Sequence, residues 1–460
     1  MGRLRQVLGD RPFMRSVATL AVPMVIQGTV TNVVSLLDNV MVGNIGTLPM
    51  SAVAIVNQLM MVFYLCIWGG LSGPDIFGTQ YAGKKDHDGV RHCFRIKWIV
   101  CLVVLFVFTI AFLCFPDGLI RLYLQGESTA EASSLTMEYA KDYLFVMVLG
   151  MLPFAVAMNY ATTLRGIGET RVPMIASTAA IFVNLLFNYL LIFGKLGFPC
   201  LGVTGAAVAT VISRLVELGI IMLHTHLHTE RYPFIRGAYR SLRVPTKLFK
   251  DVCKCGWLLW GNELFWSAGL AGILQGFSLR GLEAVAACNI AMTVANVFTC
   301  VFYSVGNTLA IMVGHELGAG RTAEAEEVGW KLNSLGLLTA FAVGAVVSVL
   351  APFIPQFYNT EDGVRRLATV LIWITASYWP FRAFVYNCFF MIRAGGKAGW
   401  TTAMDSGFMW FVRMPIVWSI GYLTDMDIRL FYFIVYWLAG LQCVLAYWMV
   451  CHSGWKRNLV

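Results

Sequence analysis

The stretch MSAVAIVN at residues 50–57 returns in altered form as LEAVAACN at residues 282–289, which is 232 positions later. The stretch RGIG at residues 165–168 likewise returns as RAGG at residues 393–396, 228 positions later. Each match alone is weak because alanine and valine are common in this chain, but the two offsets are nearly equal. They predict two copies of one unit that is roughly half the chain long. In an apolar chain, such repeats build paired helical bundles with binding sites near the bilayer midplane.

The composition excludes a soluble globular domain, because 58% of the residues are hydrophobic, 13% are charged and the mean hydropathy is +0.69. A membrane span needs about 20 mostly apolar residues, and in lipid such a run must be a helix so that its backbone groups pair within the segment. We therefore predict an all-α membrane protein with twelve transmembrane helices in two six-helix bundles related by pseudo-twofold symmetry. The predicted spans are residues 16–39, 49–73, 94–115, 138–161, 173–194, 202–224, 255–279, 284–312, 333–352, 367–391, 401–421 and 430–450.

The net charge of +9 reports membrane topology rather than a nucleic-acid partner. With both termini in the cytoplasm, most Lys and Arg residues lie in inner segments, as the positive-inside rule requires. The outer segments hold only Arg121, Lys141, Lys195, Arg280, Arg365, Arg366 and Arg429. We predict an amino-terminal lobe at residues 1–224, a basic cytoplasmic linker at 225–254 and a carboxy-terminal lobe at 255–460. We expect a monomer in the bilayer of a bacterial inner membrane.

Four polar residues at a common depth form a candidate cation site. Asp38 closes the first span, Asn184 and Asn188 are four residues apart on one face of the fifth span, and Thr210 lies in the sixth span. A carboxylate with amide and hydroxyl oxygens can bind a proton or a small hard cation. The alternative interpretation of Asp38 is an interfacial carboxylate near a helix end.

Two further positions in the spans bear on transport. Glu263 is the only carboxylate inside the seventh span, where desolvation favours its protonated form and permits a proton-accepting role. The alternative interpretation of Glu263 is a neutral acid with a structural role. Pro23 lies within the first span and lacks the N–H that a straight helix needs, so it predicts either a functional bend or a tolerated kink.

The remaining polar and aromatic residues have simpler interpretations. Arg214 and Glu217 predict a local ion pair because they are three residues apart, and Asp75 and Asp405 read as structural. The small residues of GVTGAA at 202–207 predict close helix packing. Most aromatic residues belong to lipid-facing or interface positions, but some could line a cavity for flat organic cations. The candidates for that cavity are Trp260, Trp266 and Tyr386.

Several other classes of protein are not expected. The twelve cysteines have no metal-ligand spacing, so we predict no metal site built from cysteines and no cofactor, and Asp38 is the one residue proposed to bind a metal ion, Na⁺. A membrane-embedded enzyme would need paired catalytic groups, such as a His-Glu-x-x-His helix, and the spans carry none. We therefore expect no enzymatic activity.

Taken together, the motifs resemble those of the multidrug and toxic compound extrusion family. The likeness covers nearly the whole chain, and it rests on LDNVMVG at 37–43, QYAG at 80–83, LRGIGET at 164–170, NLLFNY at 184–189 and GVTGAAVAT at 202–210.

The resemblance implies a cation-coupled antiporter with two six-helix lobes around a central cleft. It implies that Asp38, Asn184, Asn188 and Thr210 form the amino-lobe cation site for Na⁺ or H⁺, with Tyr143 beside it. Glu263 matches the acid of the NorM-type branch. Residues 367–391, however, lack the second carboxylate of that branch and carry Arg382 near its place, which adds Arg382 to the substrate-cavity candidates.

The expected activity is therefore export of organic, often cationic, drugs in exchange for Na⁺ or H⁺. The sequence does not choose between these two coupling ions. The alternative is a lipid-linked oligosaccharide flippase of the same superfamily, which would more often show additional spans and a strongly cationic cavity.

Overall fold

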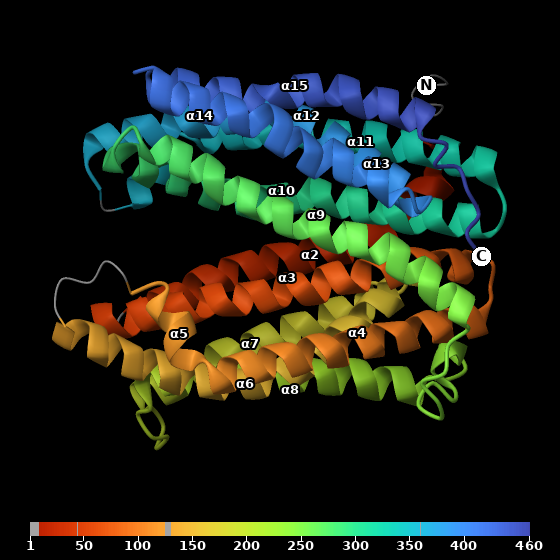
Figure 1. Cartoon of the computed structure of the whole chain (residues 1–460), viewed down its shortest axis with the longest axis horizontal. Coiled ribbons are helices and arrows are strands. Elements are labelled where there is room, and N and C mark those ends of the chain that lie inside the picture. Colours follow the sequence, from red (N-terminus) through yellow and green to blue (C-terminus); the bar gives the residue numbers. More distant parts are fainter. Residues whose placement is uncertain (1–8, 44, 125–129, 359) are drawn as a thin grey trace. The chain divides into compact units, whose positions relative to one another are not determined.

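The computed structural model describes residues 9–43, 45–124, 130–358 and 360–460, with the backbone alone described at 33, 35–40 and 130. Every regular element within these ranges is helical (Figure 1). The long helices are α2 (Arg11–Gly43), α3 (Thr47–Gly83), α4 (His87–Cys114), α6 (Ala130–Gly166), α7 (Arg171–Phe193), α8 (Gly202–Leu227), α9 (Thr246–Ser278), α10 (Leu282–Gly318), α11 (Thr322–Leu350), α12 (Asp362–Ala394), α14 (Met414–Leu423) and α15 (Ile428–His452). These twelve helices confirm the prediction of an all-helical membrane protein with twelve long helices.

Shorter elements join or continue the long helices. They are α5 (Pro116–Arg121), η1 (Pro233–Ile235), η2 (Ile354–Phe357), α13 (Ala398–Thr402), η3 (Ala403–Gly407) and η4 (Met409–Arg413). The last two are π-helical and connect α13 to α14, so residues 398–423 form one continuous helix with widened turns. Nine helices in the described ranges are long and apolar enough to cross a membrane.

The chain divides into two compact units. Unit 1 comprises Met1–Thr29, Thr79–Lys85 and Cys253–Val460, whereas unit 2 comprises Val30–Gly78 and Asp86–Val252. The helices α2, α3 and α9 are therefore shared between the units. The predicted lobe bounds at 224 and 255 stay a prediction.

In unit 1, α12 is the central helix, since it packs against α10, α11 and α15 (Figure 1). Its Trp379 is fully buried in a core that also contains Phe277 of α9 and Phe302 of α10. A second core of the same unit surrounds Leu309 and includes Trp455. The core therefore follows the length of α12. Because α12 is surrounded by other helices of unit 1, its polar side chains need hydrogen-bond or ion-pair partners from those helices.

In unit 2, α8 packs against both α6 and α7. A Cβ atom added at Gly205 of α8 would lie 2.6 Å from the carbonyl oxygen of Leu191 in α7. Only glycine allows this approach, so the predicted close packing is confirmed at Gly205. The predicted ion pair of the same helix is also confirmed, because Arg214 Nη1 lies 3.0 Å from Glu217 Oε2.

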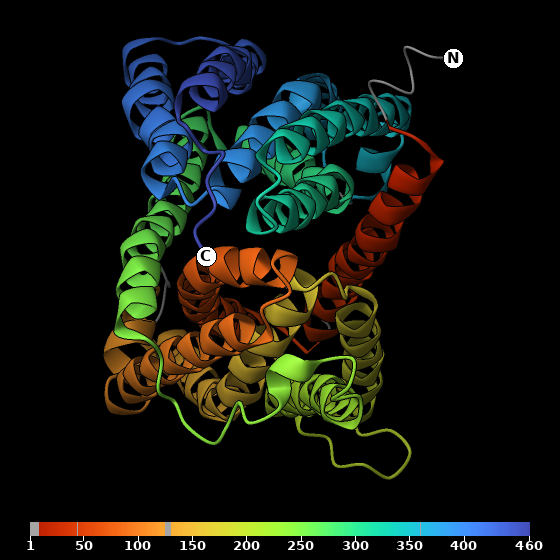
Figure 2. The same ribbon diagram turned by 90° about the vertical axis from the view of Figure 1, so that its right-hand side faces the viewer.

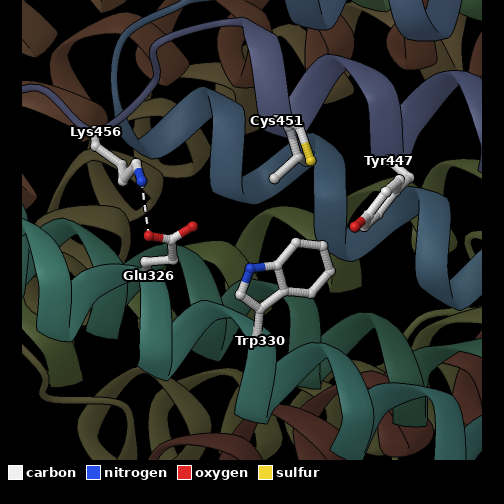
Figure 3. Close-up of a pocket in the computed structure, with 6 residues that line it drawn as sticks. Glu326, Trp330, Tyr447, Cys451 and Lys456 are labelled. Carbon is white, nitrogen blue, oxygen red and sulfur yellow. Dashed lines mark hydrogen bonds and ion pairs between the residues drawn. The ribbon is translucent and has the colours of Figure 1, made fainter.

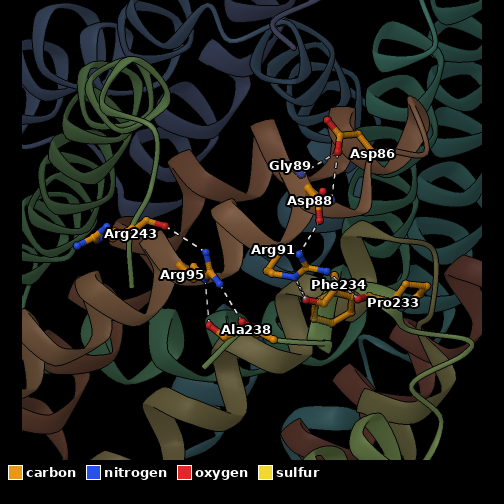
Figure 4. Close-up of polar contacts among 10 residues, drawn as sticks. Asp86, Asp88, Gly89, Arg91, Arg95, Pro233, Phe234, Ala238 and Arg243 are labelled. Atoms are coloured by element: carbon orange, nitrogen blue, oxygen red, sulfur yellow. Dashed lines mark hydrogen bonds and ion pairs between the residues drawn. The ribbon is translucent and has the colours of Figure 1, made fainter. Parts of the chain in front are cut away.

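Two arginines of α4 hold the segment between α8 and α9, which Figure 2 shows in light green. Arg91 donates from Nε to the carbonyl oxygen of Phe234 at 3.0 Å, and Arg95 donates from Nη2 to that of Gly237 at 2.8 Å. Figure 4 shows the further bonds of Arg95 to the carbonyl oxygens of Ala238 and Arg243. The linker is thus bound to unit 2 through its backbone.

A second contact fixes the beginning of the same linker. Glu169, which is 8% exposed, forms an ion pair with Arg231 and accepts a hydrogen bond from the Tyr232 hydroxyl at 3.4 Å. Burial, followed by the negative charge of Glu169, raises the pKa of Tyr232 to about 12. The phenol therefore stays protonated at physiological pH and remains a hydrogen-bond donor.

Candidate functional site

Three of the predicted cation-site residues of unit 2 form one chain of hydrogen bonds. Asn188 Nδ2 donates to Asn184 Oδ1 at 3.1 Å, and Asn184 Nδ2 donates to Thr210 Oγ1 at 3.3 Å. The Thr210 hydroxyl in turn donates to the carbonyl oxygen of Ala206 at 3.0 Å. All donors point in one direction, toward α8, so the amide oxygen of Asn188 is the acceptor end of the chain. Acceptor oxygens are what a hard cation requires.

The burial of this chain suits an ion site. Asn184 is 8% exposed and Asn188 is 3% exposed, while Thr210 is half-buried. Two amides seated in a membrane helix are costly unless they are paired, and here each pairs with a polar neighbour. The backbone of Asp38 lies in α2, but its side chain is outside the described residues. Tyr143 of α6 is 4% exposed and belongs to the hydrophobic core of unit 2.

A buried cation lies elsewhere in unit 2. Lys97 of α4 is 2% exposed, and its ammonium group forms an ion pair with Asp75 of α3. The same Nζ donates to the hydroxyls of Thr162 at 3.1 Å and Thr163 at 2.9 Å. Lysine is almost never fully buried unless it is paired. Asp75 is therefore the partner that makes Lys97 tolerable in this helix.

Unit 1 holds a second group of intramembrane charges, around Arg382 of α12. Its Nη1 lies 3.9 Å from Asp405 Oδ1, and its Nε donates to the Tyr303 hydroxyl at 3.4 Å. Asn262 of α9 donates from Nδ2 to the other oxygen of Asp405 at 3.3 Å. Arg413, which is 8% exposed, interacts electrostatically with both Arg382 and Asp405. We call these five residues the Arg382–Asp405 cluster.

The backbone of the two π-helical turns supports this cluster. Asp405 lies in η3 and Arg413 lies in η4. Asn262 is 1% exposed and accepts on Oδ1 from the backbone N–H of Ser406 at 3.3 Å and from its hydroxyl at 2.7 Å. These bonds fix the orientation of the amide that holds Asp405. Single π-turns occur frequently at functional sites.

Some of the residues predicted to line a substrate cavity contact this cluster, and others do not. Trp266 packs beneath Arg382, whose Cζ is 5.9 Å from the indole ring centroid. The rings of Tyr386 and Tyr303 are 4.3 Å apart. Trp260, by contrast, packs against Trp257, with 5.5 Å between their ring centroids. The structure thus brings Trp266, Arg382 and Tyr386 to one region.

Glu263 and Pro23 have different surroundings. Glu263 follows Asn262 on α9 and is half-buried, and it forms no hydrogen bond or ion pair within the part of the chain that the structure describes. Its electrostatic interactions are with Arg393 and Asp405. Pro23 is buried inside α2, which continues as one helix past it. The roles predicted for both residues stay predictions.

A separate pocket of about 400 Å³ lies at the ends of α11 and α15 (Figure 3). Its lining includes Trp330, Tyr447 and Cys451, and the Lys456 ammonium pairs with Glu326 at 2.7 Å across it. None of the residues singled out from the sequence lines this pocket. Both charges at its rim are already paired, so it offers no free charge to a ligand.

The sequence alone does not single out Lys97, Arg413 or the contact between Arg382 and Asp405. The sequence does indicate that these residues need partners, because each ionisable group falls within a predicted span. A charge there costs at least about 2.5 kcal/mol without a partner. Sequence position cannot show which partner each one finds, because the pairs join different helices and depend on how those helices pack.

Comparison with known proteins agrees with this architecture. The family model named MatE matches residues 23–190 and again residues 261–418, as the internal repeat predicts. The chain is 24% identical over 441 residues to the "Probable multidrug resistance protein NorM" of Thermotoga maritima, covering 92% of this chain and 91% of that protein. It is 25% identical to the "Probable multidrug resistance protein YoeA" of Bacillus subtilis, covering 90% of this chain and 88% of the relative.

A solved structure extends the comparison to the fold. The outward-facing form of a multidrug resistance MATE family transporter superimposes with a TM-score of 0.86 at 18% identity, covering 98% of each chain. The two matches of the family model together span more than half of the sequence. The chain therefore belongs to the MatE family of multidrug and toxic compound extrusion transporters.

Proposed function

We propose that this protein is a secondary antiporter that exports organic, often cationic, drug-like compounds in exchange for inward movement of Na⁺ or H⁺. It would work as a monomer in a bacterial inner membrane with both termini in the cytoplasm. Family membership and the names of the relatives, which are multidrug resistance proteins, support export of drugs. The excess of basic residues in the predicted inner segments supports the orientation.

The observation that carries the coupling proposal is the chain of hydrogen bonds through Asn188, Asn184 and Thr210. One N–H of each amide is used within this chain, and the amide and hydroxyl oxygens are ligands of the kind that a hard cation prefers. Asp38 would add the negative charge that holds Na⁺ or takes up a proton, with the phenol of Tyr143 nearby. Glu263 of unit 1 would be a second acid that responds to the same ion gradient.

Coupling requires that ion and drug favour different states of the transporter. We propose that cation binding at Asp38 reorganises the helix α2, which contains Pro23, and thereby releases the drug outward. One charge that crosses 100 mV supplies about 2.3 kcal/mol. That energy supports a roughly 50-fold accumulation before any concentration gradient of the ion is added.

Dye transport into everted membrane vesicles tests this proposal. Vesicles are energised with a Na⁺ gradient alone or a H⁺ gradient alone, and the wild type is compared with Asp38→Asn and Glu263→Gln. We expect one gradient to drive transport and Asp38→Asn to abolish it. The exposed Glu138 of α6 provides a matched control as Glu138→Gln, which should transport normally. Native exchange by Asp38→Asn would refute the coupling mechanism, and absence of transport with either gradient would refute the antiport.

A further inference from the structure

The guanidinium group of Arg382 is only loosely bound within its unit. Its polar contacts among the described residues are the Tyr303 hydroxyl at 3.4 Å and the Asp405 carboxylate at 3.9 Å. A charge-assisted hydrogen bond between a guanidinium and a carboxylate is normally about 2.7–2.9 Å long. Among the residues that the structure describes, most of the five N–H donors of Arg382 therefore have no close acceptor.

A second guanidinium adds to this donor excess. Arg413 is 8% exposed, and its Nε has no hydrogen-bond partner among the residues that the structure describes. It interacts electrostatically with Arg382, which repels it, and with Asp405, which attracts it. A buried donor without an acceptor is costly. An added acceptor at this position would remove that cost.

The balance of charge indicates which kind of ligand fits. Arg382 and Arg413 both interact electrostatically with Asp405, which is the one carboxylate of the cluster and accepts on one oxygen from Asn262. The cluster therefore has an excess of positive charge in an environment of low dielectric constant, where charges interact strongly. An incoming cation would be repelled by two guanidinium groups, whereas an anion would be attracted by both.

The surroundings also favour a flat aromatic body attached to that anion. Trp266 lies against Arg382, and the rings of Tyr303 and Tyr386 are 4.3 Å apart. The side chains of Arg382 and Asp405 remain 14% and 17% exposed, so the pair is not fully buried within its unit. Aromatic residues beside a planar guanidinium allow stacking as well as cation–π attraction.

We propose that the Arg382–Asp405 cluster binds the carboxylate of zwitterionic or anionic aromatic compounds, with Arg382 and Arg413 as the donors. The inference rests on the proposed export function and names a substrate class for it. It means that unit 1 does not hold a second coupling cation at the position of Arg382. It also means that compounds with a free carboxylate are preferred over the esters in which that carboxylate is uncharged.

Equilibrium binding by the purified full-length protein tests the inference. The probes are a rhodamine with a free carboxylate and the methyl ester of the same rhodamine, which differ only in that charge. We expect the wild type to bind the acid more tightly than the ester. We expect Arg382→Gln and Arg413→Gln each to weaken acid binding by about 10-fold or more. The exposed Arg366 of the same helix supplies the control Arg366→Gln, which should bind both dyes normally.

The ester reports on the integrity of each variant. Arg382→Gln releases Asp405 from its cationic neighbour, so binding of the cationic ester should be retained or improved while acid binding falls. A misfolded protein cannot produce these opposite changes. Equal affinity of the wild type for the two dyes, or unchanged acid binding in both Gln variants, would overturn the inference. If everted vesicles transport the ester but not the acid, only this inference fails, whereas transport of neither dye removes the proposed function as well.

Discussion

Replacement of Lys97 by methionine should destabilise the protein measurably. Methionine keeps the length of the side chain, but Asp75 loses the ammonium group that pairs with it. Breaking a buried ion pair costs about 3–5 kcal/mol. Because 29% of the Asp75 side chain is exposed, part of its charge is solvated and we expect about 2–3 kcal/mol. The hydroxyls of Thr162 and Thr163 contribute little, since both also donate to the carbonyl oxygen of Asn159.

This loss can be converted to a melting temperature. Unfolding entropy is about 2.1 cal/mol/K per residue, which for a chain of this length is roughly 1 kcal/mol/K. Lys97→Met should therefore melt about 2–3 °C lower than the wild type. Unfolding can be followed with a thiol-reactive dye, because Cys93 and Cys101 on the same helix are 1% and 0% exposed in the folded protein.

The double variant Lys97→Met with Asp75→Asn separates charge from packing. It also removes the negative charge of residue 75, so its melting temperature should return to within about 1 °C of the wild type. Lys250→Met, at an exposed position of α9, is the control and should melt like the wild type. The reasoning is wrong if Lys97→Met alone melts like the wild type. It is equally wrong if the double variant is less stable than the single one.

Three further outcomes are expected. Gly83→Ala should lower the melting temperature, because its Cβ would lie 2.1 Å from a carbonyl oxygen of α10 and overpacking costs about 1–3 kcal/mol. At Gly399 an added Cβ meets no atom within 4 Å, so the control Gly399→Ala should leave the melting temperature unchanged. Gln80→Leu should speed trypsin cleavage at Arg457, measured by mass spectrometry, because Gln80 Nε2 donates to the carbonyl oxygen of Arg457 at 3.2 Å; unchanged cleavage would contradict this. Asn188→Leu should slow ion-driven dye transport at least about 10-fold without loss of folded protein, and native transport would argue against the amide chain as the ion site.

Much of the fold could be predicted from the sequence because lipid leaves the backbone few choices. Long apolar runs must be helices, and all twelve predicted spans correspond to helical segments of the structure. Local pairs were equally accessible, as Arg214 with Glu217 and Asn184 with Asn188 show, because residues three or four apart share a helix face. The close approach at Gly205 followed from small residues alone.

Contacts between distant helices were beyond the same reasoning. The widened turns that carry Asp405 and Arg413 leave no composition signal, because residues 403–413 read as an ordinary apolar helix with two charges. The acceptors that hold the linker to Arg91 and Arg95 are backbone carbonyls, which every residue has. Side-chain identity therefore says which groups need partners but not which partners they find.

The two units differ in chemistry more than an internal repeat suggests. Unit 2 presents amide and hydroxyl oxygens in a row, an arrangement that suits a cation. Unit 1 presents guanidinium groups around one carboxylate, an arrangement that suits an anion. Two identical sites would respond to the same ligand and could not separate the ion from the drug. If both proposals hold, the cation and the carboxylate of the drug act on different units, and each can bias the conformational equilibrium without competing for the same atoms.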